Sequence, residues 1–177
     1  MGREGEKASA PPATCADLLD TPAAEAVCFA SLEAPMLVRN AVMPPRTQAI
    51  AFFSGPEDGP FVMVNLLKFK PKAEYADGAD AHLSGAEAYR RYAEAVAPMI
   101  EALGGRIRFD GEVTGILIGE VEELWDMVAL AEYPSLAAFF AMATSPAMHA
   151  IEHHRKAGLA GQLNIRTKPG AFSASRP

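Results

Sequence analysis

Phe61–Phe69, with the sequence FVMVNLLKF, is the stretch that decides the fold. Alternate side chains of a strand point to opposite faces, so one face here carries Phe, Met, Asn, Leu and Phe, and the other Val, Val, Leu and Lys. A strand with one solvated face alternates apolar and polar residues, whereas a continuous apolar run predicts a strand covered on both sides. Asn65, in the middle of the run, must then find hydrogen-bond partners at a covered position.

The sequence on either side of this strand predicts a regular alternation of elements. A short helix is expected from Thr47 to Gly55. After the strand, a helix is predicted from the capping box Ser84–Glu87 to about Leu103, with Pro98 inside it. Two strands follow, over Arg106–Gly119 and Trp125–Tyr133. The last elements are a helix from Pro134, interrupted at Ser145–Pro146 and continued for a further turn or two, and a strand over Gly161–Thr167.

This order is strand, helix, strand, strand, helix, strand, which predicts an α+β, ferredoxin-like βαββαβ fold with a four-stranded antiparallel sheet and two helices on one face. We expect residues 1–45 to be an N-terminal extension, partly disordered and with a short helix over residues 22–33. Residues 46–167 are expected to form the ferredoxin-like domain, and residues 168–177 a flexible tail.

The face of the sheet away from the helices needs a cover, because the first and third predicted strands are apolar on both sides. Soluble monomers rarely expose more than several hundred Å² of contiguous apolar surface. At about 25 cal/mol per Å², covering this face is worth several kcal/mol. The cover is either a second copy of the chain, related by a two-fold axis, or the helix over residues 22–33. We favour the second copy, because the short Ala-rich helix would cover only part of the sheet.

Composition narrows the function classes. The net charge of −6 and the pI near 5.2 argue against nucleic-acid binding. No apolar run approaches the roughly 20 residues that span a bilayer, and the first residues lack the apolar core of a secretory signal. Cys15 and Cys28 have no CxxC partner, so we interpret them as buried or incidental thiols of a cytoplasmic protein. No phosphate-cradling, dinucleotide-binding or nucleophile-elbow motif is present, so no cofactor is predicted.

Five residues are candidate ligand-binding residues, and each has a structural alternative. Asn65 could orient a ligand or bond to a nearby backbone and fix the strand register. Tyr89 and Tyr92, on the apolar stripe of their helix, could form a pocket wall or belong to the core. Trp125 could line a pocket mouth or seal one end of a barrel. Glu132 lies on a doubly apolar strand, so it is either paired in a structural ion pair or part of a site that raises its pKa.

His154 and Arg155 are the candidate catalytic residues. A neutral imidazole at His154 could act as a base, and the Arg155 guanidinium could bind a carboxylate or enolate with two hydrogen bonds. The alternative is that Arg155 pairs with Glu132 or Asp126 and fixes the last helix.

The segment His149–His153 spells HAIEH, which matches the H-x-x-E-H pattern of some zinc proteases. Two histidines four positions apart share one face of a helix, but a third ligand is required, and no acidic residue follows His153. We therefore predict no metal site and interpret the segment as a solvated helix end.

Four segments in order resemble a known family, the domains of unknown function numbered 1330 (DUF1330), within the dimeric α+β barrel superfamily. They are FVMVNLLKF (61–69), SGAEAYRRYAEAV (84–96), WDMVALAEYPS (125–135) and HHRKAGLAG (153–161). The resemblance covers roughly residues 47–167 and implies a ferredoxin-like protomer whose sheet packs against that of a second copy. It implies no reaction, since relatives in the superfamily include cofactor-independent monooxygenases, isomerases, haem enzymes and ligand-sensing domains.

Two hypotheses about function follow. In the first, a homodimer joined through its sheet faces binds a small, partly apolar metabolite and acts as a cofactor-independent monooxygenase or isomerase, with His154 as the base and Asn65, Arg155 and Tyr89 positioning the ligand. In the second, the protein is a non-catalytic ligand-sensing or protein-interaction module, and the same polar residues are structural.

Overall fold

The computed structural model describes residues 37–57 and 59–170. From Arg39 onward the described residues belong to one compact unit. The helix predicted over residues 22–33, Cys15, Cys28 and the last seven residues of the predicted tail lie outside the described residues.

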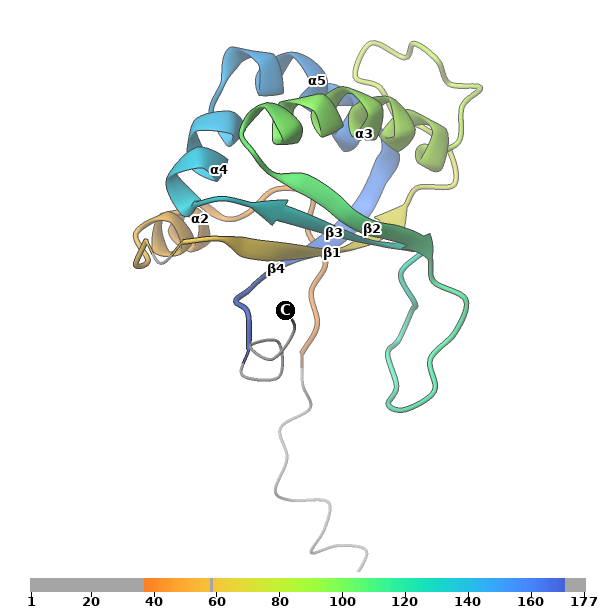
Figure 1. The fold of residues 1–177 in the computed structure, drawn as a ribbon. Helices are drawn as coiled ribbons and strands as arrows, with labels where there is room; N and C mark the ends of the chain where they lie inside the picture. Colours follow the sequence, from red (N-terminus) through yellow and green to blue (C-terminus); the bar gives the residue numbers. More distant parts are fainter. Residues whose placement is uncertain (1–36, 58, 171–177) are drawn as a thin grey trace, which may run out of the picture. The chain divides into compact units, whose positions relative to one another are not determined.

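The order of helices and strands confirms the predicted βαββαβ arrangement (Figure 1). The elements are α2 (Arg46–Phe53), β1 (Phe61–Phe69), α3 (Gly85–Ala102), β2 (Arg106–Glu112), β3 (Met127–Tyr133), α4 (Leu136–Ala143), α5 (Pro146–Gly158) and β4 (Leu159–Thr167). The second crossover therefore contains two helices, separated at Ser145. None of the described helices combines the length and the apolar character that a membrane span requires.

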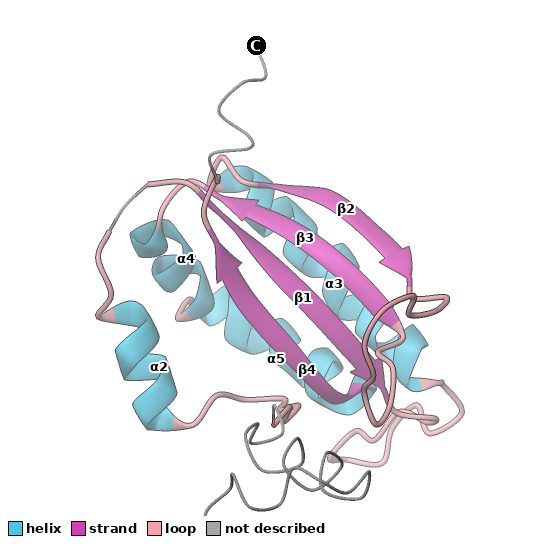
Figure 2. Cartoon of the chain, turned by 90° about the horizontal axis from the view of Figure 1, so that it is seen from below, coloured by secondary structure: helices cyan, strands magenta, loops and turns pink. Residues whose placement is uncertain are grey.

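The four strands form one antiparallel sheet in the order β2-β3-β1-β4, which is the ferredoxin-like order (Figure 2). The predicted strand of Phe61–Phe69 is central, with β3 on one side and β4 on the other. Helices α3, α4 and α5 lie on one face of the sheet, here called the inner face (Figure 1). The opposite side is the outer face.

The core lies between the inner face and the helices. From β1 it contains Phe61 and Met63, both at most 3% exposed. These side chains pack with residues of the neighbouring strand and of all three helices: Ala131, Tyr133, Val96, Ile100, Met142 and Met148. Helix α2 joins through Phe52 and Phe53, whose rings contact Phe139 of α4. Helices α3, α4 and α5 thus cover the inner face.

The outer face is also apolar, as the sequence of β1 predicted. Residues that pair across the sheet share a face, and the outer face carries Val62, Val64 and Leu66 of β1, Val128 and Leu130 of β3, and Leu163 and Ile165 of β4. These side chains are half-buried or exposed, with Ile165 46% exposed. Phe109 of β2, opposite Leu130, extends this apolar face and is 53% exposed.

Several predicted boundaries differ from the structure, and the two largest differences are in β2 and α5. The strand predicted to run to Gly119 ends at Glu112, because the following residues leave the sheet as a long loop that turns at Gly119, where φ is 90°. Helix α5 has 13 residues rather than one or two turns. Ser145 caps it by accepting a hydrogen bond from the Met148 amide, and Pro146 takes the first helical position, where proline costs no hydrogen bond.

Candidate functional site

Asn65 points to the inner face in the middle of β1. Its side-chain Nδ2 donates to the carbonyl oxygens of Ala129 on β3, at 3.0 Å, and of Met63, at 3.2 Å. Both amide hydrogens are therefore used within the sheet, as in the structural alternative of the sequence analysis. Only the side-chain carbonyl oxygen is left to accept a hydrogen bond from a ligand.

Tyr89 and Tyr92 lie on the side of α3 that faces the sheet and α5. Their ring centroids are 5.6 Å apart, and Tyr89 also contacts the Phe69 ring of β1 at 5.4 Å. The Tyr92 hydroxyl donates to the Met148 sulfur. Burial raises the pKa of both phenols above the usual value, so both stay neutral at physiological pH.

Arg155 of α5 reaches the same place. Its guanidinium carbon lies 5.9 Å from the centroid of the Tyr92 ring, a cation–π distance. Its Nη1 donates to the Val42 carbonyl at 2.8 Å, and its Nη2 contacts the Met43 sulfur. No described carboxylate forms an ion pair with Arg155. The two partners that the sequence suggested pair with other residues, Glu132 with Arg106 and Asp126 with Lys68.

The segment before α2 brings Val42 and Met43 to Arg155. Ala41 pairs with Gln162 of β4 through two backbone hydrogen bonds of 3.1 Å, which fixes the chain along the open edge of the sheet. The next residue then faces α5. The candidate residues described so far belong to the sheet or to the helices that pack on its inner face. They are Asn65 on β1, Tyr89 and Tyr92 on α3, and Arg155 on α5.

His154 belongs to a different group of contacts. Its Nδ1 is 2.7 Å from the hydroxyl of Tyr75, which lies in the loop between β1 and α3. Partial burial, and then the neighbouring His153 and Arg91, lower the pKa of His154 from the usual value, while Asp80 opposes this effect. The imidazole is therefore neutral near pH 7. No contact among the described residues joins His154 to Asn65.

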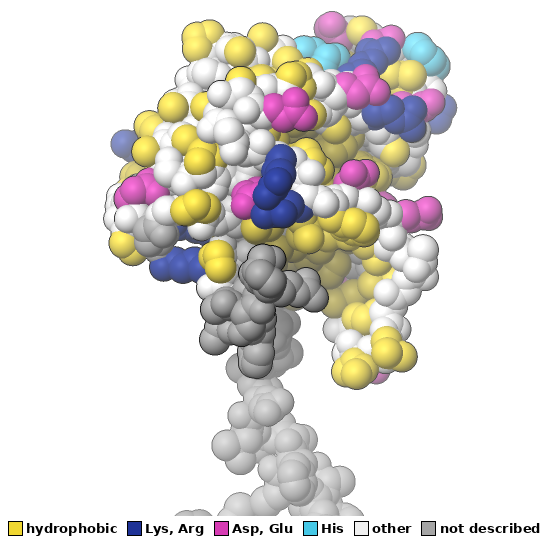
Figure 3. All heavy atoms as spheres, viewed as in Figure 1, with side chains coloured by type: hydrophobic (Ala, Val, Ile, Leu, Met, Phe, Trp, Pro, Cys, Tyr) yellow, Lys and Arg dark blue, Asp and Glu magenta, His cyan; other side chains and the backbone are white. Residues whose placement is uncertain are grey.

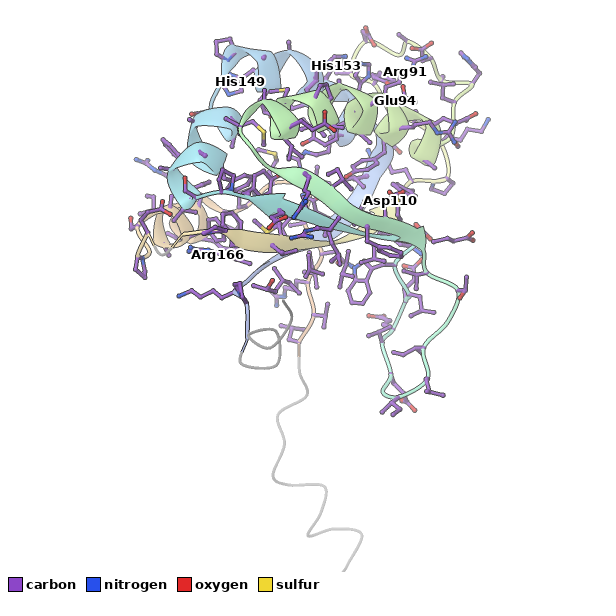
Figure 4. The ribbon with its side chains drawn as sticks, in the orientation of Figure 1. Arg91, Glu94, Asp110, His149, His153 and Arg166 are labelled. Atoms are coloured by element: carbon purple, nitrogen blue, oxygen red, sulfur yellow. The ribbon has the colours of Figure 1, made fainter. Side chains whose placement is uncertain are left out.

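The surroundings of His154 lie on the side of the helix layer that faces away from the sheet. Figure 4 shows His149, His153 and Arg91 on that side. The rings of His153 and His154 are 3.9 Å apart, and Arg91 forms an ion pair with Asp80. The sequence analysis did not identify Tyr75 as a candidate. The signal that could have found it is a lone aromatic residue in a polar loop.

Glu132 and Trp125 lie outside both groups. Glu132, on the outer face, binds Arg106 at 2.7 Å and Arg108 at 2.6 Å. Hydrogen bonds from Arg108 and Arg106 lower the pKa of this carboxyl, which is the paired alternative of the sequence analysis. The Trp125 indole donates to the Asn40 side chain at 2.8 Å, next to the start of β3.

The H-x-x-E-H segment lies on α5, and its glutamate is bound locally. Glu152 pairs with Lys156 at 2.6 Å, one helical turn further on. Among the described residues, no group of three or more His, Cys, Asp or Glu side chains is arranged to hold a metal ion.

Sheet order, crossover helices and core together define a ferredoxin-like α+β protein. The model of the family "Domain of unknown function (DUF1330)" matches residues 79–167, and the chain belongs to this family.

Comparison with solved structures gives the following similarities. The chain is similar to the RPA0582 protein of unknown function from Rhodopseudomonas palustris, with 36% identity, a TM-score of 0.66, and 74% of this chain and 98% of that chain covered. A structure described as methylated RPA0582 has 36% identity and a TM-score of 0.68, and the match covers 75% of this chain and 96% of that chain. A dabb family protein with a ferredoxin-like fold from Mesorhizobium loti has 13% identity and a TM-score of 0.41, with 64% and 100% covered. Among curated proteins, none matches the chain.

Proposed function

We propose that the protein is a homodimer in which the outer faces of two sheets pack into an α+β barrel, and that each copy binds a small, partly apolar molecule between its sheet and helices. The apolar outer face is the observation that supports the dimer. Apolar side chains cover the centre of this face on three neighbouring strands, and Phe109 continues it on the fourth.

The size of the face makes pairing favourable. Four strands about 4.8 Å apart and about seven residues long, at ~3.3 Å per residue, present roughly 400 Å². At ~25 cal/mol per Å², burying that area contributes about 10 kcal/mol per copy. For two copies this contribution is of the same order as the ~4–15 kcal/mol that association costs in lost freedom of motion.

A ligand with an apolar body and an anionic group fits the residues beside the inner face. The Tyr89 and Tyr92 rings offer apolar surface, and Arg155 offers a cation that binds no carboxylate of the described chain. A planar guanidinium suits a carboxylate or an enolate because it can donate two parallel hydrogen bonds. The side-chain oxygen of Asn65, on the inner face of β1, would add a hydrogen-bond acceptor.

Sedimentation equilibrium of the full chain at micromolar concentration tests the dimer. We expect twice the mass of the 18.8 kDa chain for the wild type, and a monomer for Val64→Lys, which puts a charge in the centre of the outer face. Ala150→Lys, at an exposed position of α5, is the matched control and should remain dimeric. A monomeric wild type, or a dimeric Val64→Lys variant, would contradict the proposal.

Thermal-shift measurements with a panel of small aromatic and aliphatic carboxylates, and their neutral amides, test the ligand site. A carboxylate at 100 times its Kd stabilises by about 2.7 kcal/mol, or ~5–10 °C for a chain of this size. The shift should disappear in Arg155→Gln and persist in Arg91→Gln, the control from the other side of the helix layer. Equal shifts for acids and amides, or a shift that survives Arg155→Gln, would count against the site.

A second candidate function, proton transfer at His154, is favoured by the Tyr75–His154 hydrogen bond. For this step Nδ1–H donates to the Tyr75 hydroxyl oxygen, which leaves Nε2 of the neutral ring unprotonated, so Nε2 would take the proton from a carbon acid, the first step of a cofactor-independent isomerisation or oxygenation. Deuterium incorporation from D₂O into stabilising compounds measures this step. Loss in His154→Ala and a drop of about tenfold in Tyr75→Phe would support it. Deuterium exchange that is unchanged in His154→Ala, or absent with the wild type, would contradict proton transfer at His154 and support a protein that binds without catalysis.

A further inference from the structure

The loop between β2 and β3, residues 113–126, is a second feature of the outer side, and we call it the arm. Figure 1 shows the arm extending from the end of the sheet, on the side away from the helices. At its base, the Val113 amide donates to the Asp126 carbonyl at 3.0 Å. The Asp126 amide in turn donates to the Leu67 carbonyl of β1 at 2.8 Å. The two ends of the arm are thus tied to each other and to the central strand.

Lys68 holds the returning half of the arm in place. Its ammonium group pairs with Glu123 at 2.9 Å and Asp126 at 3.2 Å, and donates to the Leu124 carbonyl at 2.9 Å. Glu123 and Asp126 raise the pKa of Lys68, so the ammonium stays charged. Asp126 also accepts a hydrogen bond from the Phe69 amide at 2.6 Å. These contacts fix the direction in which the arm leaves the sheet.

The far part of the arm carries three consecutive aliphatic residues that are exposed in the structure. Ile116 is 49% exposed, Leu117 96% and Ile118 86%. Figure 3 shows apolar side chains at the end of the arm and on the sheet below the helix layer. Single exposed aliphatics are ordinary on protein surfaces, but three in a row on a fixed support indicate a contact surface.

We propose that the arm packs against a second copy of this chain, whose sheet lies on the outer face. Packed sheets lie about 10 Å apart. Ile116 and Ile118 are three and five residues beyond Val113, and at ~3.3–3.6 Å per residue they extend up to ~10–18 Å from the base. The arm therefore spans the gap between two packed sheets, and its aliphatic residues reach the level of the other copy.

The area of the outer face gives a second reason to expect that the arm contacts the second copy. Stable interfaces bury about 800 Å² on each partner. The outer face alone offers roughly 400 Å² of flat area, from the strand spacing and length. Packing of the arm on the partner supplies part of the difference, and it does so with residues continuous with the outer face through Phe109 and the β2–β3 end of the sheet. The second copy is therefore the occupant that the arm fits.

This inference rests on the proposed dimer, and one experiment separates the two. Sedimentation equilibrium gives the dimer dissociation constant of the full chain, of Leu117→Asp/Ile118→Asp, and of Ile50→Asp, a control on α2 that is 55% exposed. We expect the double variant to raise the dissociation constant at least tenfold and the control to leave it within twofold. Circular dichroism should show equal folding for all three, because the two arm residues contribute almost no buried area to one copy.

The outcomes are distinct. A wild type that stays monomeric would overturn the dimer and the arm contact together. A dimeric wild type whose dissociation constant is unchanged in the double variant would overturn the arm contact alone. As an independent readout, hydrogen exchange at residues 115–118 should slow when wild type is concentrated from monomer to dimer. It should stay fast in Val64→Lys at every concentration, and slow exchange in that monomeric variant would count against the arm contact.

Discussion

Gly85, the first residue of α3, and Gly158, the last residue of α5, lie in direct backbone contact. A Cβ atom built on Gly85 would lie 2.5 Å from the Gly158 carbonyl oxygen, and one on Gly158 would lie 2.8 Å from the Tyr89 amide nitrogen. The Lys70 amide donates to the same Gly158 carbonyl at 2.9 Å, so the end of β1 also joins this crossing. The contact sets how deeply α5 lies against α3, and thereby where Arg155 meets Tyr92.

Replacing Gly158 by alanine should destabilise the protein strongly. The added methyl group meets backbone rather than flexible side chains, so the helices must separate, and such overpacking costs about 3 kcal/mol. Urea unfolding at fixed protein concentration measures the loss. Gly115→Ala is the control, since nothing lies within 4 Å of a Cβ there, and it should change stability little. A Gly158→Ala variant as stable as wild type would show that the two helices are not held at this distance.

Asn65→Ala should also destabilise, because the side chain is bonded within the sheet. It removes two hydrogen bonds, to Ala129 and Met63, and we expect a loss of ~1–3 kcal/mol in urea unfolding. Asn65→Asp should cost at least as much, because a carboxylate cannot donate to either carbonyl. Asn164→Ala, at the exposed position opposite on β4, is the control. If Asn65→Ala unfolds at the wild-type midpoint yet abolishes ligand shifts, the role of Asn65 is in binding alone.

The sequence predicted the sheet because its signal is local and periodic. The run of Phe61–Phe69 has the exact bounds of β1, and the capping box at Ser84 begins α3 as expected, with Glu87 bonded back to the Ser84 amide. The close contact of Gly85 with Gly158 had no such signal, because neither glycine is in a turn pattern, and the contact joins residues far apart in the chain.

The candidate site was predicted less well, for the same reason. His154 and Arg155 are neighbours in sequence and were assigned to one site, but successive residues of a helix point about 100° apart. One therefore meets Tyr75 in a loop and the other meets Val42. Both partners come from irregular segments whose paths are set by tertiary contacts, such as the pairing of Ala41 with Gln162. Periodicity gives no information on such segments.

Glu132 should stabilise the fold in a pH-dependent way. Arg108 and Arg106 lower its pKa in the folded protein below the usual 4.5, so its contribution is present above pH 4.5 and is lost as the pH falls through the folded pKa. Pairs as exposed as these typically contribute ~0.2–1 kcal/mol each. Glu132→Gln should therefore unfold at lower urea than wild type at pH 7, and the two curves should approach each other at pH 3.5. A constant difference at both pH values would show that the charge is not responsible. Glu101→Gln, at an exposed position of α3, is the control.

His154 should make stability depend on pH in a different range. Its folded pKa is below the unfolded 6.5, so between these two values the unfolded chain binds more protons, and stability falls as the pH drops through 6.5. The groups that face it are Tyr75 and Asp80 from the loop, Arg91 from α3 and His153 from α5.

Wild type should therefore lose more of its Tm between pH 7.5 and 5.5 than His154→Gln does, because the variant has no group to protonate at this place. His149→Gln, at an exposed position of the same helix, should follow the wild type. Tyr75→Phe separates the two causes of the effect: it removes the hydrogen bond of 2.7 Å but keeps the burial and the neighbouring His153 and Arg91. The dependence on pH should then persist in Tyr75→Phe, and its disappearance there would place the cause in the hydrogen bond rather than in burial and charge.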